Sequence, residues 1–150
     1  MIDFTKVYRL IDSALYLDEN TAWIFAFDNE TKEHIIWLNT EYQLHEKGLF
    51  SDGTSTSDYS PVTVRYKIQK GQRYDHMTFK DTGGFYDSFF VRVDANGFII
   101  DADGQVSSET NLFDVYGQNI AGLTDENMDW LVEVLTEKYL IYAKKQLGIL

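Results

Sequence analysis

The chain has 150 residues, of which 44% are hydrophobic and 15% aromatic, a composition that supports one packed domain and excludes a disordered tail. A formal net charge of −11 argues against a general DNA-binding surface, because phosphate contacts require clustered Lys and Arg. The absence of cysteine excludes disulfides, thiolate metal sites and thiol nucleophiles.

Residues 1–150 are therefore expected to form a single domain, and helices are predicted for its first third. Apolar residues recur at steps of three and four from Ile2 to Leu17, which is typical of a helix with one buried face. The run Ala22 to Phe27 fits either a buried helix or a short strand. A second helical pattern begins near Thr31 and is expected to stop at Gly48.

The middle of the chain carries a loop and then a helix start. Residues 51–60 are rich in Ser, Thr, Asp and Gly, which favour a solvated surface loop. Ser60 followed by Pro61 matches an N-cap and first helical residue, so a short helix is predicted over Val62 to Gln69. The four residues from Lys80 to Gly83, which include Thr82, predict a turn that leads into a hairpin.

An antiparallel hairpin is the clearest strand signal. Its strands are predicted at about 88–94 and 97–103, with Asn96 and Gly97 in the turn because both residues tolerate positive φ. No internal repeat of solenoid length is present. The order of elements predicts an α+β fold, with this small sheet packed against N-terminal helices and a long C-terminal helix.

The C-terminal third is predicted to be mainly helical. After a loop over Ala102 to Asn111, a short amphipathic helix is expected over Leu112 to Ile120 with Tyr116 pointing inward. Thr124 is the expected N-cap of the long final helix. The buried stripe of that helix is predicted to comprise Met128, Leu131, Leu135, Tyr139, Tyr142, Ala143 and Leu147.

Motifs for catalysis or cofactor binding are missing from the sequence. Asp94, Asn96, Asp101 and Asp103 lie close together, but the spacing of a calcium loop fails downstream of Asp101. The three histidines fall in separate elements, and neither a nucleophile elbow nor a phosphate loop is present. We expect no metal, no cofactor and no enzymatic activity, although a pair of carboxylates acting on carbohydrate stays open among so many acids.

Basic residues gather between Tyr59 and Phe90, against the charge of the rest of the chain. This cluster, proposed as a subunit interface, comprises Arg65, Lys67, Lys70, Arg73 and Lys80. Lys67 and Lys70 fit two interpretations equally well, compensation of a helix dipole or contact with a partner. The aromatic residues beside the cluster are assigned to the core, because the acidic surroundings oppose stacking on single-stranded nucleic acid.

The same segment resembles tailed-bacteriophage virion-morphogenesis or tail-completion proteins. The first matching block consists of Tyr59, Ser60, Pro61, Thr63 and Lys67, and the second of Lys80, Asp81, Thr82, Gly83, Phe85 and Ser88. A weaker similarity runs from Ile36 to Gly117 and into the last helix, covering about two thirds of the chain. The better-known branch ends with a segment rich in proline and arginine, whereas Pro61 is the only proline here.

The resemblance implies a non-enzymatic structural protein of the virion, located at the head–tail junction or tail after assembly in the host cytoplasm. It implies one connector-like domain that forms a homo-oligomeric ring and contacts portal, neighbouring connector or tail proteins. DNA would be passing cargo, sliding through a channel lined partly by acids, namely Asp101, Asp103, Asp125, Glu126, Asp129 and Glu133.

A small acidic DNA mimic that inhibits a host nuclease is the alternative function. It also requires small size, no cofactor and dense surface carboxylates. A secretory signal and an apolar run near the roughly 18 residues of a membrane span are both missing from the sequence, so no membrane partner is predicted.

Overall fold

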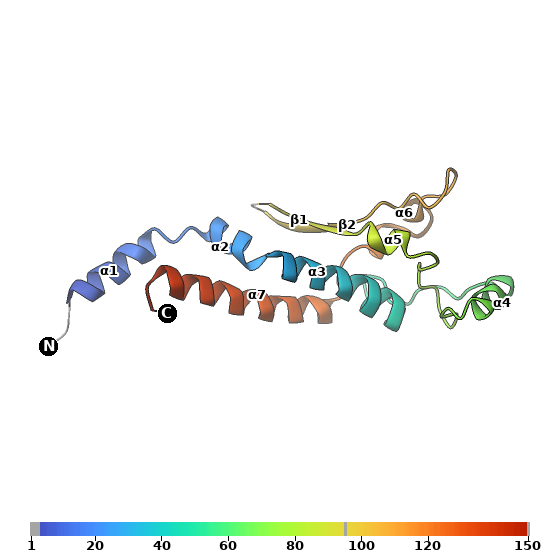
Figure 1. Ribbon diagram of the computed structural model, residues 1–150, viewed down its shortest axis with the longest axis horizontal. Helices are drawn as coiled ribbons and strands as arrows, with labels where there is room; N and C mark the ends of the chain where they lie inside the picture. The colour runs from blue at the N-terminus through green and yellow to red at the C-terminus, as the bar shows by residue number, and fades with distance from the viewer. Residues whose placement is uncertain (1–3, 95, 150) are drawn as a thin grey trace.

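The computed structural model describes residues 4–94 and 96–149, and its elements lie in an elongated body (Figure 1). In chain order the N-terminal half contains α1 (Phe4–Leu15), α2 (Glu19–Ala26), α3 (Asn29–Trp37), the π-helical η1 (Leu38–Lys47) and α4 (Pro61–Gln69). The second half contains α5 (Gly84–Asp87), β1 (Phe90–Asp94), β2 (Gly97–Asp101), α6 (Leu112–Tyr116), the 3-10 turn η2 (Gln118–Ile120) and α7 (Asp125–Gln146).

Three layers make up the body. The helical line from α2 through α3 to η1 runs in the middle, with α7 along one side and the hairpin on the other (Figure 1). Ile35 and Leu38 of the middle layer pack with Leu131 and Leu135 of α7 in one buried cluster. The predicted α+β class, with a small antiparallel hairpin packed against N-terminal helices and with a long C-terminal helix, is confirmed.

The hairpin is the only sheet within the described residues. β1 and β2 pair antiparallel, from Phe90 opposite Asp101 to Asp94 opposite Gly97. Each strand is about two residues shorter than predicted, at the end away from the turn. Burial alternates along both strands, which is why Val91 and Val93 face the core while Arg92 faces solvent. Gly97, one of the two expected turn residues, has a positive φ of 147°.

The N-terminal helices form where the sequence predicts them, but the expected burial of one face of α1 is wrong, because Tyr8, Ile11 and Leu15 are exposed. α2 resolves the ambiguity at 22–27, because this run is helical and buries Ala22, Ala26 and Phe27. The second predicted helix ends as expected at Gly48, whose φ of 63° is left-handed. A β-carbon there would come within 2.6 Å of the His76 ring, so glycine is required at this position.

The start of α3 is set by a residue that the sequence pattern missed. Asp28 Oδ1 accepts a hydrogen bond from the Thr31 amide at 2.9 Å, and Lys138 of α7 donates to the same carboxylate. Burial alone would raise the pKa of Asp28, but these hydrogen bonds outweigh it and hold the pKa below its usual value. The cap thereby also ties α3 to α7.

Two expectations for the second half of the chain are corrected. The Thr82–Gly83 turn does not lead directly into the hairpin, because Gly83 instead starts the short helix α5. Tyr116 does not point inward. It is 37% exposed at the end of α6, and its ring contacts Phe79 edge-on at 5.1 Å. The five-residue α6 is too short to present a continuous buried face.

Two buried amides join η1 to the start of α7. Asn39 donates to the Ile120 carbonyl and accepts from the Gly122 amide. Gln43 donates to the Gly122 carbonyl and accepts from the Thr124 amide at 2.9 Å. These four bonds satisfy backbone groups of a buried segment that belongs to neither a helix nor a strand.

Candidate interaction surfaces

The basic segment begins with the helix start that the sequence predicts. The Ser60 hydroxyl accepts a hydrogen bond from the Thr63 amide at 3.2 Å, and Pro61 is the first residue of α4. Thr82 Oγ1 accepts from the amide of Gly84, and Gly83 has a left-handed φ of 96°. Ser60 and Pro61 therefore have the roles predicted for them, whereas Thr82 and Gly83 form a turn that leads into α5 and not into the hairpin.

Lys67 is not available to a neighbouring subunit, which corrects one of the five interface candidates. Its side chain is only 5% exposed. The ammonium donates to the Lys80 carbonyl at 2.9 Å and to Gln72 Oε1 at 3.3 Å, and lies 4.8 Å from the centre of the Tyr59 ring. A buried ammonium is stable only with such partners, so Lys67 joins α4 to the 72–80 segment inside the subunit.

Of three other candidates, two are paired within the described part of the chain and one is not. Lys70 binds Asp81 at 3.0 Å, and this hydrogen bond raises the pKa of Lys70. Arg73 donates two hydrogen bonds to Asp75 and one to Glu46, and the bond from Arg73 lowers the pKa of Asp75 to about 2. Within the described residues Arg65 forms no ion pair, and it is exposed.

Lys80, the remaining candidate, also has an acidic partner. Its ammonium lies 2.5 Å from Glu41 of η1 and above the Tyr86 ring. Acidic residues of η1 and of the Tyr59–Phe90 segment thus neutralise most of the basic cluster that the sequence shows. Such partly exposed pairs contribute little to stability individually, but they leave Arg65 as the main unpaired cation of this surface.

Replacing Lys67 by methionine is expected to lower the free energy of unfolding by about 1–2 kcal/mol, because the Lys80 carbonyl loses its buried donor. Urea denaturation followed by circular dichroism measures the change. Arg65→Met on the same helix is the matched control, with an expected effect of less than about 0.5 kcal/mol since Arg65 is exposed. Equal stability of the two variants would contradict the internal role of Lys67.

A groove of about 650 Å³ lies between α4 and α6, with Tyr66, Phe79 and Leu112 among the residues that line it. Phe79 is the only non-glycine described residue with positive φ, at 59°. The neighbouring Thr78 is held on both sides, since its amide donates to the Tyr59 hydroxyl and its carbonyl accepts from the Tyr86 hydroxyl. These bonds fix the backbone that holds Phe79 in its strained conformation.

Burial raises the pKa of the Tyr86 phenol, so this hydroxyl stays protonated and donates. The Thr78 network is a rigid support for the groove floor.

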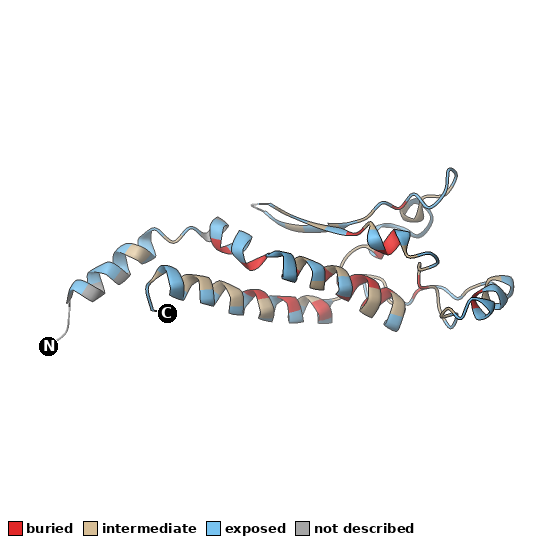
Figure 2. Cartoon of the chain, viewed as in Figure 1, coloured by how far each residue is buried: buried red, intermediate tan, exposed pale blue. Residues whose placement is uncertain are grey.

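The second surface is the apolar face of α1. Tyr8 is 73% exposed and Leu15 is 77% exposed, with Ile11 between them also more than half exposed. Buried residues are concentrated in the middle of the body, and α1 projects from it at one end (Figure 2). An amphipathic helix gains little stability in water unless its apolar face is covered.

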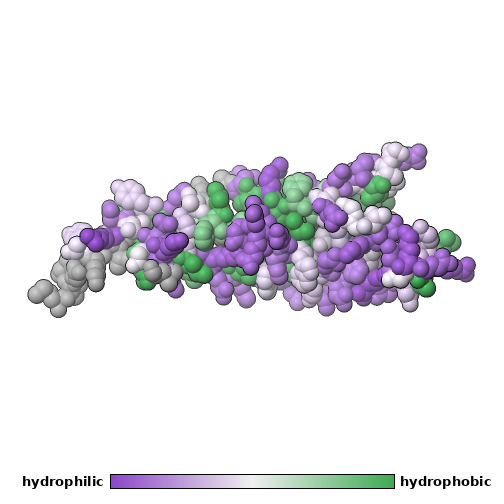
Figure 3. All heavy atoms as spheres, viewed as in Figure 1, coloured by the Kyte–Doolittle hydropathy of each residue, from purple (hydrophilic) through white to green (hydrophobic). Residues whose placement is uncertain are grey.

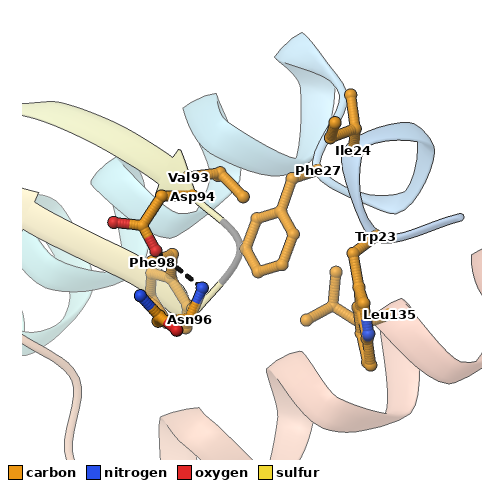
Figure 4. Close-up of a pocket in the computed structure, with 9 residues that line it drawn as sticks. Trp23, Ile24, Phe27, Val93, Asp94, Asn96, Phe98 and Leu135 are labelled. Atoms are coloured by element: carbon orange, nitrogen blue, oxygen red, sulfur yellow. Dashed lines mark hydrogen bonds between the residues drawn. The ribbon is translucent and has the colours of Figure 1, made fainter. Parts of the chain in front are cut away.

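An apolar pocket of about 500 Å³ lies between α2, α7 and the hairpin (Figure 4). Its lining includes Trp23, Ile24 and Phe27 of the α2 region, Val93 and Phe98 of the hairpin, and Leu135 of α7. On the face seen in Figure 3, apolar side chains gather over the region of α2 and the hairpin. Asp94 and Asn96 form a polar rim of this pocket, and the backbone amide of Asn96 donates a hydrogen bond to Asp94 Oδ1.

The described residues contain no group of three His, Asp or Glu side chains arranged to hold a metal ion. Asp94 and Asp101 lie at opposite ends of the hairpin, and Asp101 and Asp103 accept hydrogen bonds from nearby backbone amides. His34 stacks on Trp130, while burial lowers the pKa of His45. These groups serve as turn caps and packing residues.

None of the helices in the described part of the chain combines the length and hydropathy of a transmembrane span.

Comparisons with protein-family models, with curated proteins and with solved structures find no match to this chain. The phage resemblance accordingly stays a prediction.

Proposed function

We propose that the protein is a non-enzymatic virion subunit, a head–tail connector or tail-completion protein that assembles into a ring. The observation that carries the assembly role is the uncovered apolar face of α1, where Tyr8, Ile11 and Leu15 are exposed. Isolated exposed hydrophobic residues are normal, but three large apolar side chains exposed together on one face of a helix form a surface for association. The position at the portal or tail rests on the resemblance of the Tyr59–Phe90 segment.

The charges of α7 are compatible with a channel for passing DNA. Asp125, Asp129 and Glu133 are exposed and follow one another at steps of four residues, so they form a stripe along the helix. Carboxylates repel phosphates, and a channel lined by them would let DNA slide without adhesion. The ring itself is a head-to-tail assembly in which one surface of each subunit meets a different surface of the next.

Native mass spectrometry of the full chain, alone and with purified phage portal protein, tests this function. The expected result is a closed oligomer whose mass is an integer multiple of the chain mass, alone or on the portal. A chain that stays monomeric in both samples over the micromolar range would contradict the proposal. So would catalytic turnover of a cell-wall or carbohydrate substrate.

The stripe on α7 also favours the alternative of a DNA-mimic inhibitor, which is ranked second. Four helical residues advance about 6 Å, whereas one strand of DNA carries a phosphate every 3.4 Å or so along the axis. The stripe is therefore much less densely charged than DNA. Inhibition of host nucleases at stoichiometric concentration would move this alternative ahead of the connector.

A further inference from the structure

Large apolar side chains are exposed on both α1 and α2 at one end of the molecule. At about 200 Å² per aromatic side chain, the exposed fractions of Tyr8, Tyr16 and Trp23 amount to roughly 400 Å². Ile11, Leu15 and Ile24 add three largely exposed aliphatic side chains. Tyr8, Ile11 and Leu15 belong to one face of α1, whereas Trp23 and Ile24 belong to α2 and line the apolar pocket. Each copy therefore exposes two separate apolar surfaces, a helix face and an open pocket.

The geometry of α1 suits insertion into a groove. Tyr8, Ile11 and Leu15 stand at positions i, i+3 and i+7 of the helix, which is the anchor spacing of an amphipathic helix that docks in an apolar cleft. The polar residues Arg9 and Asp12 are exposed beside this face. By their spacing along the helix, these two charged residues border the apolar face on the same side.

The pocket between α2, α7 and the hairpin is the matching receptor. Phe27 points into it between Leu135 and the hairpin, with Trp23 and Ile24 at its edge (Figure 4). Ile24 is 68% exposed, so the pocket remains open and its rim is not covered by the subunit itself. Its volume of about 500 Å³ has room for several large apolar side chains.

The α1 helix of the same chain does not fill this pocket. It extends away from the hairpin in Figure 1. Its C-terminal end lies beside the C-terminal end of α7, where Tyr16, Tyr142 and Gln146 line a shallow cleft. Another copy of the chain supplies the same helix with its apolar face free.

We propose that α1 of one copy docks in the α2–α7–hairpin pocket of the next copy, with Tyr8, Ile11 and Leu15 as its anchors. The inference rests on the proposed ring, for which it names the contact between subunits. Because the helix and the pocket are different surfaces, the interaction repeats in one direction and closes when the rotation between subunits allows a ring.

Cysteine cross-linking tests the contact directly, since the chain has no native cysteine. Full-length Ile11→Cys and Ile24→Cys chains, distinguished by mass, are mixed and oxidised. The yield of the disulfide-linked heterodimer is expected to be about tenfold or more above that of a control pair, Ile11→Cys with Val115→Cys. Docking raises the effective concentration of the two thiols in the test pair. Val115 is similarly exposed but lies on α6.

Three outcomes would overturn the docking mode. The first is a heterodimer yield no higher than that of the control pair. The second is a predominance of homodimers of the Ile11→Cys chain. The third is an internal disulfide in a chain that carries both Ile11→Cys and Ile24→Cys and is oxidised at high dilution. The last result would mean that α1 folds back on its own chain.

Native mass spectrometry of the Leu15→Glu variant provides the second measurement. This variant is expected to lose the oligomer, whereas the control variant Val115→Glu is expected to keep it. If wild-type rings form but the cross-link is missing, the docking mode is wrong and the proposed function stands. If the cross-link forms but no ring appears alone or on the portal, the contact stands and the proposed function fails.

Discussion

Replacing Gln43 by alanine is expected to lower the free energy of unfolding by about 3 kcal/mol. The substitution removes the donor to the Gly122 carbonyl and the acceptor for the Thr124 amide. It also removes the acceptor for the Asn127 side chain, which is itself buried. A buried polar group left without a partner costs about 1–3 kcal/mol, and backbone groups at the start of α7 would lose theirs together.

Chemical denaturation at low protein concentration measures this effect, and Gln118→Ala is the matched control. Gln118 is exposed on η2, close to the same segment, and its side chain forms no hydrogen bond among the described residues. Its substitution is expected to change stability by less than about 0.5 kcal/mol. A Gln43→Ala variant as stable as the control would show that the buried amides do not hold η1 to α7.

Replacing Leu131 by alanine is expected to cost about 3–4 kcal/mol. Leu131 is fully buried in the cluster that joins α7 to Ile35 and Leu38 of the middle layer. The loss combines the transfer free energy of the removed methyl groups with a cavity that the neighbouring helices cannot fill completely. For a domain of this size the thermal midpoint falls by about 2–4 °C per kcal/mol.

Leu140→Ala on the same helix separates the cavity effect from helix propensity. Leu140 is about half exposed, so its truncation leaves no enclosed cavity and is expected to cost less than about 1 kcal/mol. Calorimetry of both variants at equal concentration gives the comparison. Similar midpoints for the two would mean that α7 is not packed on the middle layer in solution.

Local signals in the sequence predicted much of the secondary structure. The Ser60–Pro61 start of α4, the Gly48 stop of η1 and the Thr124 cap of α7 depend on contacts within one helical turn, and all three are present. Such features need no knowledge of distant residues. The buried stripe of α7 was predicted only in part: Leu131 and Leu135 are buried, whereas the other predicted members are half-buried, namely Met128, Tyr139, Tyr142, Ala143 and Leu147.

The interface candidates show where local reasoning fails. Lys67 looks like a surface cation in the sequence, yet Tyr59, Gln72 and the Lys80 carbonyl surround its ammonium. Glu41 of η1 likewise neutralises Lys80 from 39 positions away in the chain. Charge along a sequence therefore did not predict charge on the surface, because the neutralising partners are brought in by tertiary folding.

By itself the sequence determined the α+β class, the hairpin and most helix ends, since periodicity and capping act over a few residues. Only the tertiary structure decided that Asn39 and Gln43 hold the start of α7, because their partners lie about 80 positions away. It also decided that the apolar face of α1 is left uncovered and that an open apolar pocket forms between α2, α7 and the hairpin. An amphipathic pattern predicts that a face will be buried, but the packing of the whole chain decides whether the covering surface belongs to the same copy.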